Sequence, residues 1–150
     1  MARAPFQVLV FPFRPTDDGF EYAVFRRADG DGQVWQAISG GGEDDETPLA
    51  AALREMAEEG GIAPSAELIV LDARASIPAH GFAACALWGP NVYVIPEHAF
   101  AVRLGPGDDV ALSDEHHEHL WLPYQAAWER LTWQSNRVAL WELHTRLGRR

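Results

Sequence analysis

The stretch GGGEDDETPLAAALREMAEEGGI, residues 40–62, decides the fold of this chain. Its second half predicts a helix over residues 47–60. Thr47 can cap the N-terminus of this helix, and Pro48 fits its first turn. Apolar residues then recur at helical spacing among strong helix formers, and the glycine pair at 60–61 is typical of a helix end.

Three carboxylates sit at the end of this helix where they are least favoured. Glu55, Glu58 and Glu59 lie in its last turns, where the helix dipole is negative and each acidic residue costs about 0.3–1 kcal/mol. Arg54 can offset only part of this repulsion, through an i,i+4 pair with Glu58. One reading is a solvated acidic face. The other is a site for a divalent cation, because Mg²⁺ and Mn²⁺ prefer carboxylate oxygens and would reverse the sign of the interaction.

Fixed residue types at strict spacing favour the cation site. The stretch matches the pattern G-x5-E-x7-R-E-U-x-E-E-x-G-U, where U is a bulky apolar residue. The matching positions are Gly40, Glu46, Arg54, Glu55, Met56, Glu58, Glu59, Gly61 and Ile62. This pattern is the Nudix box, and in it the chain resembles the Nudix hydrolases.

The resemblance implies an α/β fold, a Nudix-type α/β/α sandwich with a mixed β-sheet and a loop–helix–loop catalytic motif. It also implies Mg²⁺-dependent (or Mn²⁺-dependent) hydrolysis of a small phosphorylated molecule. Carried over residue by residue, it implies metal ligands at Glu55, Glu58 and Glu59, completed by a carbonyl of Ser39 or Gly40. Glu55 could instead orient the attacking water. Glu46 and Arg54 would aim the ligating glutamates.

The rest of the chain alternates between predicted strands and helices. Strands are predicted over 6–13, 21–27, 34–38, 67–75, 82–88, 91–95 and 118–122, with 100–104 either a strand or part of a long excursion. Two closing helices are predicted over 123–131 and 135–147, with Ser135 as the N-cap of the second. This order indicates one mixed α/β domain over residues 1–150.

Composition narrows the class of function. The chain has 150 residues and a net charge of −10, and all 12 of its basic residues are arginine. So acidic a chain should repel a nucleic-acid polymer, although a metal ion can stand between it and a small phosphorylated substrate.

The single cysteine, Cys85, excludes an internal disulfide and a multi-thiolate zinc site. No apolar run predicts a membrane span, and the start of the chain predicts a strand rather than a signal peptide. We therefore expect a cytoplasmic protein, as a monomer or a homodimer.

Candidate substrate contacts lie just before the box. Arg26 and Arg27 end a predicted strand and could clamp phosphates with bidentate hydrogen bonds, or could be surface charges on an edge strand. Trp35 could stack on a base or a pterin, or could pack in the core. Gly41, inside the glycine run, is a further candidate contact.

A dense His/Glu stretch, residues 113–122, follows later. Nudix proteins often carry an extra glutamate well after the box as a ligand or general base, and Glu115 matches that placement best, with Glu118 as the alternative. A solvated acidic loop is the plainer reading. A zinc site is disfavoured because no cysteine or separate histidine pair completes it.

The late segment LTWQSNR, residues 131–137, carries the last candidates, Asn136 and Arg137, which could reach the substrate or brace the final helix. With the W-Q-x-I-S-G run at 35–40 and the D-E-H run at 114–116, this segment resembles the bacterial dihydroneopterin triphosphate pyrophosphatases, also described as dATP pyrophosphohydrolases. Residues 80–109 differ from what that branch leads us to expect. Alternative substrates are dinucleoside polyphosphates, oxidised nucleotides and nucleotide sugars, and the non-enzymatic alternative is a nucleotide-sensing domain.

Overall fold

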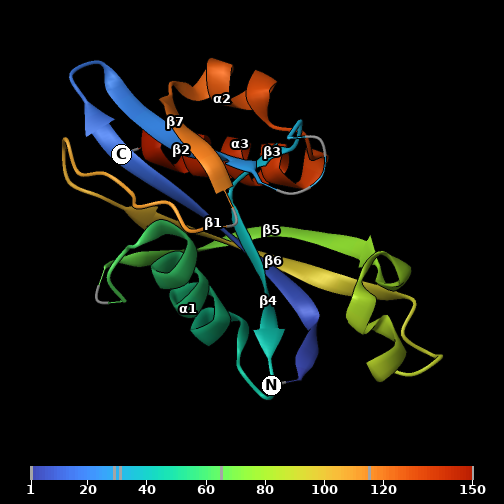
Figure 1. Ribbon diagram of the computed structural model, residues 1–150. Helices are drawn as coiled ribbons and strands as arrows, with labels where there is room; N and C mark the ends of the chain where they lie inside the picture. Colours follow the sequence, from blue (N-terminus) through green and yellow to red (C-terminus); the bar gives the residue numbers. More distant parts are fainter. Residues whose placement is uncertain (1, 29, 31, 65, 115, 150) are drawn as a thin grey trace.

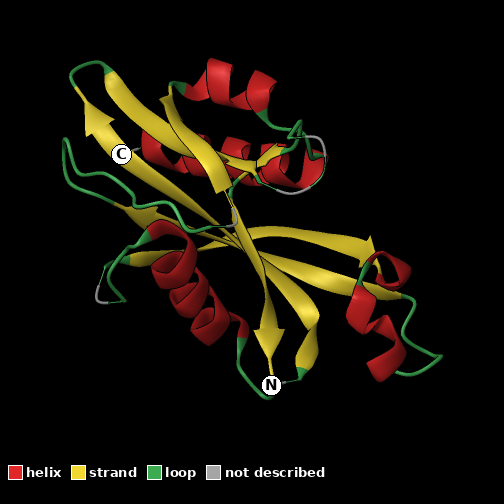
Figure 2. Cartoon of the chain, viewed as in Figure 1, coloured by secondary structure: helices red, strands yellow, loops and turns green. Residues whose placement is uncertain are grey.

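A computed structural model describes residues 2–28, 30, 32–64, 66–114 and 116–149 of the chain. Its helices are α1 (Pro48–Gly60), α2 (Tyr124–Arg130) and α3 (Gln134–Gly148), with two 3₁₀ helices, η1 (Ala79–Gly81) and η2 (Ala83–Leu87). Its strands are β1 (Arg3–Thr16), β2 (Gly19–Arg27), β3 (Trp35–Gln36), β4 (Ile38–Glu43), β5 (Leu68–Pro78), β6 (Val94–Arg103) and β7 (His116–Leu122) (Figure 2).

The strands form one mixed sheet between two helical layers. The strand order is β3-β2-β1-β6-β5, with β4 paired to β1 and β7 paired to β2. The β1–β6 pair is parallel, and the other pairs are antiparallel. Figure 1 shows α1 on one side of the sheet and α2 with α3 on the other. The predicted α/β/α sandwich is therefore confirmed.

Strand alternation builds a core on each face of the sheet. On β1, Val8 and Val10 join the cluster under α1, whereas Leu9, Phe11 and Phe13 join the cluster under α2 and α3. Successive side chains of a strand point to opposite faces, so a strand buried on both faces reads as a continuous apolar run. Gln7 of β1, Ser39 of β4 and Glu97 of β6 line the cavities described below.

Local signals set the limits of α1 as predicted. The Thr47 hydroxyl accepts a hydrogen bond from the Ala50 N–H (3.2 Å), and Pro48 occupies the first turn. Gly61 ends the helix in the left-handed conformation, at φ 63°. That conformation costs a glycine little because it has no Cβ. The box glutamates are thereby held in the last two turns of a well-defined helix.

The segment between β5 and the end of β6 differs from the predicted strands. The predicted strand over 82–88 is helical, because its alanine-rich segment is closed by local bonds such as Cys85 N–H to Phe82 O (3.1 Å). Its end is docked by the Trp88 indole N–H, which donates to Arg3 O (2.7 Å). The predicted strands over 91–95 and 100–104 form one strand, β6.

The first strand also runs further than predicted. It continues past Arg14 to Thr16, with Pro15 opposite Phe20 in the β1–β2 hairpin. Proline is tolerated in a strand where its missing N–H is not needed by the sheet. In the described residues, no helix is both long enough and apolar enough to span a membrane.

Candidate active site

The box glutamates face the glycine-rich strand β4 across a pocket. This pocket, here called the α1 pocket, has a volume of about 390 Å³. Its walls are the last turns of α1, the segment Ser39–Gly41 of β4, and side chains from β1 and β2; from α1 they include Arg54, Glu55, Glu58 and Glu59. The structure thus brings all three predicted metal-ligating glutamates and the predicted carbonyl donors to one place.

Arg54 organises the acidic end of the pocket. Its guanidinium donates two hydrogen bonds of 2.9 Å to Glu46, one to each carboxylate oxygen. It also donates to Gly41 O (2.8 Å), to Glu55 Oε1 (2.9 Å) and to Glu58 Oε2 (3.3 Å). The predicted i,i+4 pair with Glu58 is therefore present. One arginine connects the loop before α1, the strand β4 and two box glutamates.

The Glu46–Arg54 pair is electrostatically matched. Hydrogen bonds from Arg54 lower the pKa of Glu46, and the Glu46 carboxylate in turn raises the pKa of Arg54. Glu46 Oε1 also accepts from the Glu43 N–H (2.8 Å), which ties the loop before α1 to the same carboxylate. A fork of this kind fixes orientation as well as charge.

The three box glutamates differ in exposure. Glu55 and Glu59 are buried, whereas 58% of the Glu58 side chain is exposed. Glu59 Oε2 accepts from the Ser113 hydroxyl (2.9 Å) and lies 3.4 Å from His116 Nδ1. Two carboxylates are therefore buried, and the third, Glu58, is largely exposed to solvent while it accepts a hydrogen bond from Arg54.

The donor set suits a hard divalent cation. The carboxylates offer oxygen ligands, which Mg²⁺ and Mn²⁺ prefer. The absence of a side chain at Gly40 leaves room for the Glu55 carboxylate, because a Cβ at this position would overlap it. Across the described residues, no group of three or more His, Cys, Asp or Glu side chains is gathered as a metal site. Here Glu55 and Glu58 turn toward Arg54 instead.

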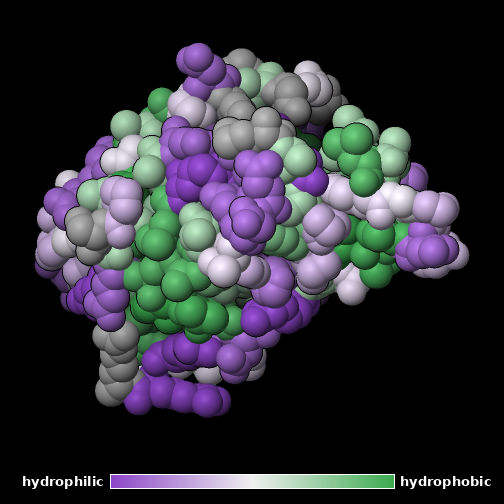
Figure 3. Space-filling view, turned by 90° about the horizontal axis from the view of Figure 1, so that it is seen from below, coloured by the Kyte–Doolittle hydropathy of each residue, from purple (hydrophilic) through white to green (hydrophobic). Residues whose placement is uncertain are grey.

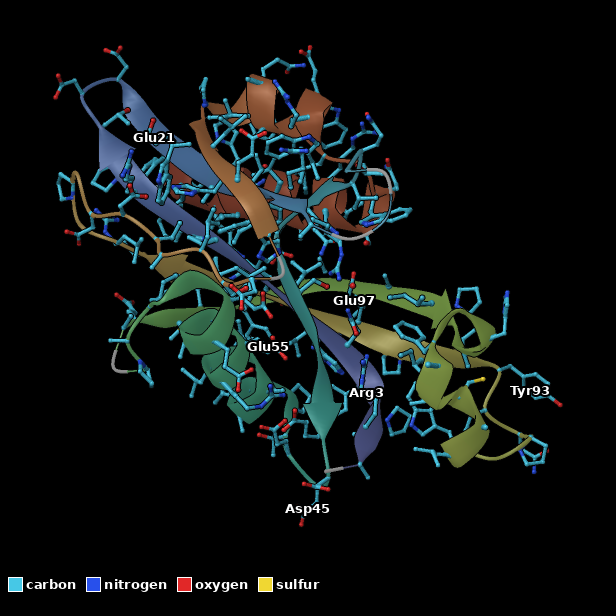
Figure 4. All side chains as sticks on the ribbon, in the orientation of Figure 1. Arg3, Glu21, Asp45, Glu55, Tyr93 and Glu97 are labelled. Atoms are coloured by element: carbon cyan, nitrogen blue, oxygen red, sulfur yellow. The ribbon has the colours of Figure 1, made fainter. Side chains whose placement is uncertain are left out.

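A polar row from the N-terminal strand reaches the pocket and was missed in the sequence analysis. Arg3 donates to the Gln7 amide oxygen, and Gln7 Nε2 donates to Ser39 Oγ (2.9 Å). Figure 4 shows Glu55 on one side of β4 and Arg3 with Glu97 on the other. Arg3 and Gln7 carry no motif, and only the β1–β4 pairing brings them to Ser39 and Gly41.

The predicted arginine clamp is divided. Arg27 lines the α1 pocket. Arg26 instead forms a salt bridge with Glu118 on β7 (2.8 Å). The register of β2 against β7 shifts between these two residues, and of the two only Arg27 lines the α1 pocket.

The outer glutamate predicted at Glu115 lies outside the described residues. Its alternative, Glu118, is held by Arg26 rather than by the α1 pocket. In the same stretch, His116 lies beside Glu59, whereas His119 Nε2 lies 2.9 Å from Asp109 Oδ1. The described histidines of this stretch therefore turn to different carboxylates, which does not favour zinc.

The late segment at 131–137 fastens β3 and the start of β4. The Trp35 N–H donates to Thr132 Oγ1 (2.9 Å), and the Trp35 C=O accepts from the Thr132 N–H (3.0 Å). Asn136 Oδ1 accepts from the Ala37 N–H (2.8 Å). Trp35 is 8% exposed and belongs to the core cluster under α3. The core-packing alternative is thus the better reading of Trp35, and Asn136 acts as a brace.

The start of α3 differs from the prediction. The helix begins at Gln134, and its N-cap residue is Trp133, not Ser135. The Ser135 hydroxyl is used elsewhere: it donates to the Glu97 carboxylate and accepts from Asn136 Nδ2 (3.3 Å). Arg137 donates to Trp128 O (3.0 Å), which favours bracing over substrate contact.

A second cavity opens beside the α1 pocket. It has a volume of about 300 Å³ and is here called the β6 cavity. It shares Gln7, Ser39 and Phe82 with the α1 pocket. Its remaining walls come from β3, the end of β5, β6 and the start of α3, and comprise Gln36, Ile77, Glu97, Trp133, Ser135 and Asn136.

Comparison with known proteins agrees with this geometry. A family model described as the NUDIX domain matches residues 5–141. The fold is similar to that of a protein described as a candidate NUDIX hydrolase of Listeria monocytogenes, with 41% identity, a TM-score of 0.85 and coverage of 97% of this chain and 96% of that one. It is also similar to the Escherichia coli dihydroneopterin triphosphate pyrophosphohydrolase, with 25% identity, a TM-score of 0.79 and coverage of 97% and 99%.

Part of a longer protein is also similar to this chain. Over 114 residues, the chain is 37% identical to a Myxococcus xanthus protein named octanoyltransferase. The match covers 76% of this chain but 29% of that protein, so the chain spans under a third of that relative's length. The match of the family model over most of the chain, on a fold that places Gly40, Arg54 and the three box glutamates around one pocket, shows that this chain belongs to the Nudix family.

Proposed function

We propose that this protein is a Mg²⁺-dependent pyrophosphohydrolase. Its substrate would be a nucleoside or pterin triphosphate, such as dihydroneopterin triphosphate or dATP, cleaved to a monophosphate and pyrophosphate. The observation that carries the proposal is the α1 pocket, where the three box glutamates, together with Glu43, and three arginines, Arg3, Arg27 and Arg54, line one space. Carboxylates suit a metal ion, and guanidinium groups suit phosphates.

Each group of the pocket has a task in this reaction. Glu55, Glu58 and Glu59, with a carbonyl of Ser39 or Gly40, would hold the metal. When bound, the metal would neutralise phosphate charge and lower the pKa of a water molecule. Arg54, held by Glu46, keeps Glu55 and Glu58 within reach of each other. Positioning of this kind supplies much of the catalysis in phosphoryl transfer.

The positive side of the pocket would bind the phosphate chain. Arg3 lies over the Phe82 ring (5.1 Å to the centroid) and is held by Gln7, so its guanidinium is positioned before a substrate arrives. Arg27 lies in the same pocket on β2. Together they offer planar donors for phosphates that the metal leaves uncovered.

Two similarities support the choice of substrate. The fold neighbour from Escherichia coli is a dihydroneopterin triphosphate pyrophosphohydrolase, and its likeness covers nearly the whole of both chains. The segment at 131–137, which resembles that branch, is built into the site because it fastens the strands beside Ser39. The β6 cavity, which adjoins the α1 pocket, has aromatic residues in its wall and would take the ring system of such a substrate.

A substrate panel tests the proposal. The purified protein is incubated with Mg²⁺ and, in turn, with dihydroneopterin triphosphate, the four dNTPs, a dinucleoside tetraphosphate, an oxidised nucleotide and a nucleotide sugar. Pyrophosphate and orthophosphate are scored separately. We expect pyrophosphate from a triphosphate and no release without divalent metal. Absence of turnover on every compound would contradict the proposal. Preferred cleavage of a compound that is not a triphosphate would contradict the proposed substrate class.

A further inference from the structure

The β6 cavity contains a buried carboxylate that the proposed chemistry does not use. Glu97 on β6 is 6% exposed, and its Oε1 has no hydrogen-bond partner in the described part of the chain. The Ser135 hydroxyl donates to the same carboxylate, and burial raises the pKa of Glu97. A buried carboxylate oxygen without a donor is unfavourable unless a ligand supplies one.

The sheet register brings Glu97 to the substrate side. In the parallel β1–β6 pair, Glu97 lies opposite Gln7. Gln7 is hydrogen-bonded to Arg3 and Ser39, which line the α1 pocket. A molecule whose phosphates lie in the α1 pocket can therefore extend its other end past Gln7 toward Glu97.

The walls of the cavity suit a flat ring. Phe82 and Trp133 supply aromatic surface, and Ile77 supplies an aliphatic side chain. The Trp133 indole N–H donates to Gln36 Oε1 (3.1 Å), so the amide nitrogen is the donor end of Gln36. The cavity thus combines stacking surface, an amide donor for a carbonyl, and a carboxylate acceptor.

We propose that Glu97 selects the substrate by accepting two hydrogen bonds from a heterocycle with a ring N–H beside an exocyclic amine. This is the 2-amino-4-oxo-pyrimidine element that guanine and pterins share. Adenine presents a ring nitrogen lone pair beside its amine, and that lone pair would face a carboxylate oxygen. The inference rests on the proposed function, because it is the α1 pocket that would hold the phosphates of the same molecule, and of the two substrates proposed there it favours dihydroneopterin triphosphate over dATP.

A matched set of substrates isolates each contact. kcat/KM is measured with Mg²⁺ for dGTP, dITP and dATP. The hypoxanthine of dITP keeps the ring N–H of guanine and lacks only the amine. We expect dGTP to exceed dITP by about tenfold and dATP by about a hundredfold, because hydrogen bonds to charged groups discriminate on this scale. Equal values for dGTP and dATP would overturn the inference.

Glu97→Gln places an N–H donor where one acceptor stood. We expect kcat/KM for dGTP to fall by roughly 10–100-fold and that for dATP to stay within about threefold. Glu67→Gln, at an exposed glutamate between α1 and β5, is the matched control and should leave all three values unchanged. Equal losses on dGTP and dATP in Glu97→Gln would overturn the inference. If this variant does not fold, the ratio of kcat/KM for dGTP to kcat/KM for dITP in the wild-type protein still tests the inference.

Binding without metal separates this inference from the proposed function. The affinities of dGMP, dIMP and dAMP are measured by calorimetry in EDTA. Tighter binding of dGMP that is lost in Glu97→Gln would support the inference even if no triphosphate were hydrolysed, in which case the proposed function alone would fail. Hydrolysis of triphosphates with equal binding of dGMP and dAMP would overturn the inference and leave the proposed function standing.

Discussion

Replacing Gly40 by alanine would test whether the position of Glu55 governs turnover. A Cβ at Gly40 would overlap the Glu55 carboxylate, and even the more distant oxygen, Oε2, lies 2.5 Å from it. Ordinary contacts between such atoms begin near 3.4 Å, so the carboxylate must move by about 1 Å. A displacement of about 1 Å in a catalytic group can lower turnover by roughly a hundredfold. We therefore expect kcat for Gly40→Ala to fall by about two orders of magnitude.

The fold should tolerate this substitution better than the activity does. The overlapping atoms are the far end of a side chain that can rotate, so we expect about 1–3 kcal/mol of destabilisation. Gly81→Ala is the matched control, because nothing lies within 4 Å of a Cβ there. Pyrophosphate release at saturating Mg²⁺ and thermal unfolding are measured for both variants. Wild-type kcat in folded Gly40→Ala would refute the reasoning.

Four further changes have definite expected outcomes. Glu59→Gln removes a buried candidate ligand and should reduce kcat by orders of magnitude while the circular dichroism spectrum is kept; unchanged kinetics at saturating Mg²⁺ would reject the assignment. Glu115→Gln should lose more activity than Glu118→Gln in parallel assays, and the reverse order would move the outer glutamate to the second position. Thr47→Ala removes the cap of α1 and should cost about 1 kcal/mol, seen as a Tm lower by about 2–4 °C, whereas an unchanged Tm would mean that the cap contributes nothing. Burial raises the pKa of Glu97, so ionisation of its carboxyl destabilises the fold as pH rises through the pKa of the unfolded chain, near 4.3. Glu97→Gln should therefore have a higher Tm than wild type at pH 7, and the difference in Tm should disappear below about pH 4. A difference in Tm that is constant with pH would contradict this.

Local sequence signals made the helix α1 predictable. Thr47, Pro48 and Gly61 mark its ends through hydrogen bonds and backbone conformations that involve only neighbouring residues. The spacing of the box then placed Glu55, Glu58 and Glu59 on the same helix end, and the structure brings them to the α1 pocket. Features set within a few residues of chain were therefore readable from the sequence.

Contacts between distant segments were not readable in this way. The segment around Cys85 has the composition of a short strand but docks as a 3₁₀ helix through Trp88 on Arg3. Ser135 resembles a helix cap, yet its hydroxyl is directed to Glu97 on another strand. In both cases the deciding partner lies more than 30 residues away, so no local pattern reveals it.

The same limit explains the residues of the site that were missed. Arg3, Gln7 and Glu97 stand alone in the sequence, and they meet because β1 pairs with β4 on one side and with β6 on the other. Trp35 shows the opposite error, since an aromatic residue near a motif suggested stacking but is buried in the core.

Much of the polar surface and two apolar areas can be seen in Figure 3, which views the molecule from below Figure 1. The larger apolar area lies on the side where Figure 1 places α1, and a smaller one lies toward the end where Figure 1 places the segment between β5 and β6. Leu87 and Tyr93 of this segment are 72% and 77% exposed. The segment contributes Phe82 to both the α1 pocket and the β6 cavity and so forms part of the wall between them and solvent.

Calorimetric titration with Mn²⁺ in the presence of a nonhydrolysable triphosphate tests the central claim most directly. The claim is that the α1 glutamates hold a divalent cation that grips a phosphate chain. We expect saturable uptake by the wild-type protein and a loss of at least tenfold in affinity for Glu58→Gln and Glu59→Gln, with Glu67→Gln unchanged. Absence of uptake by the wild-type protein, or equal uptake by all four proteins, would contradict the account.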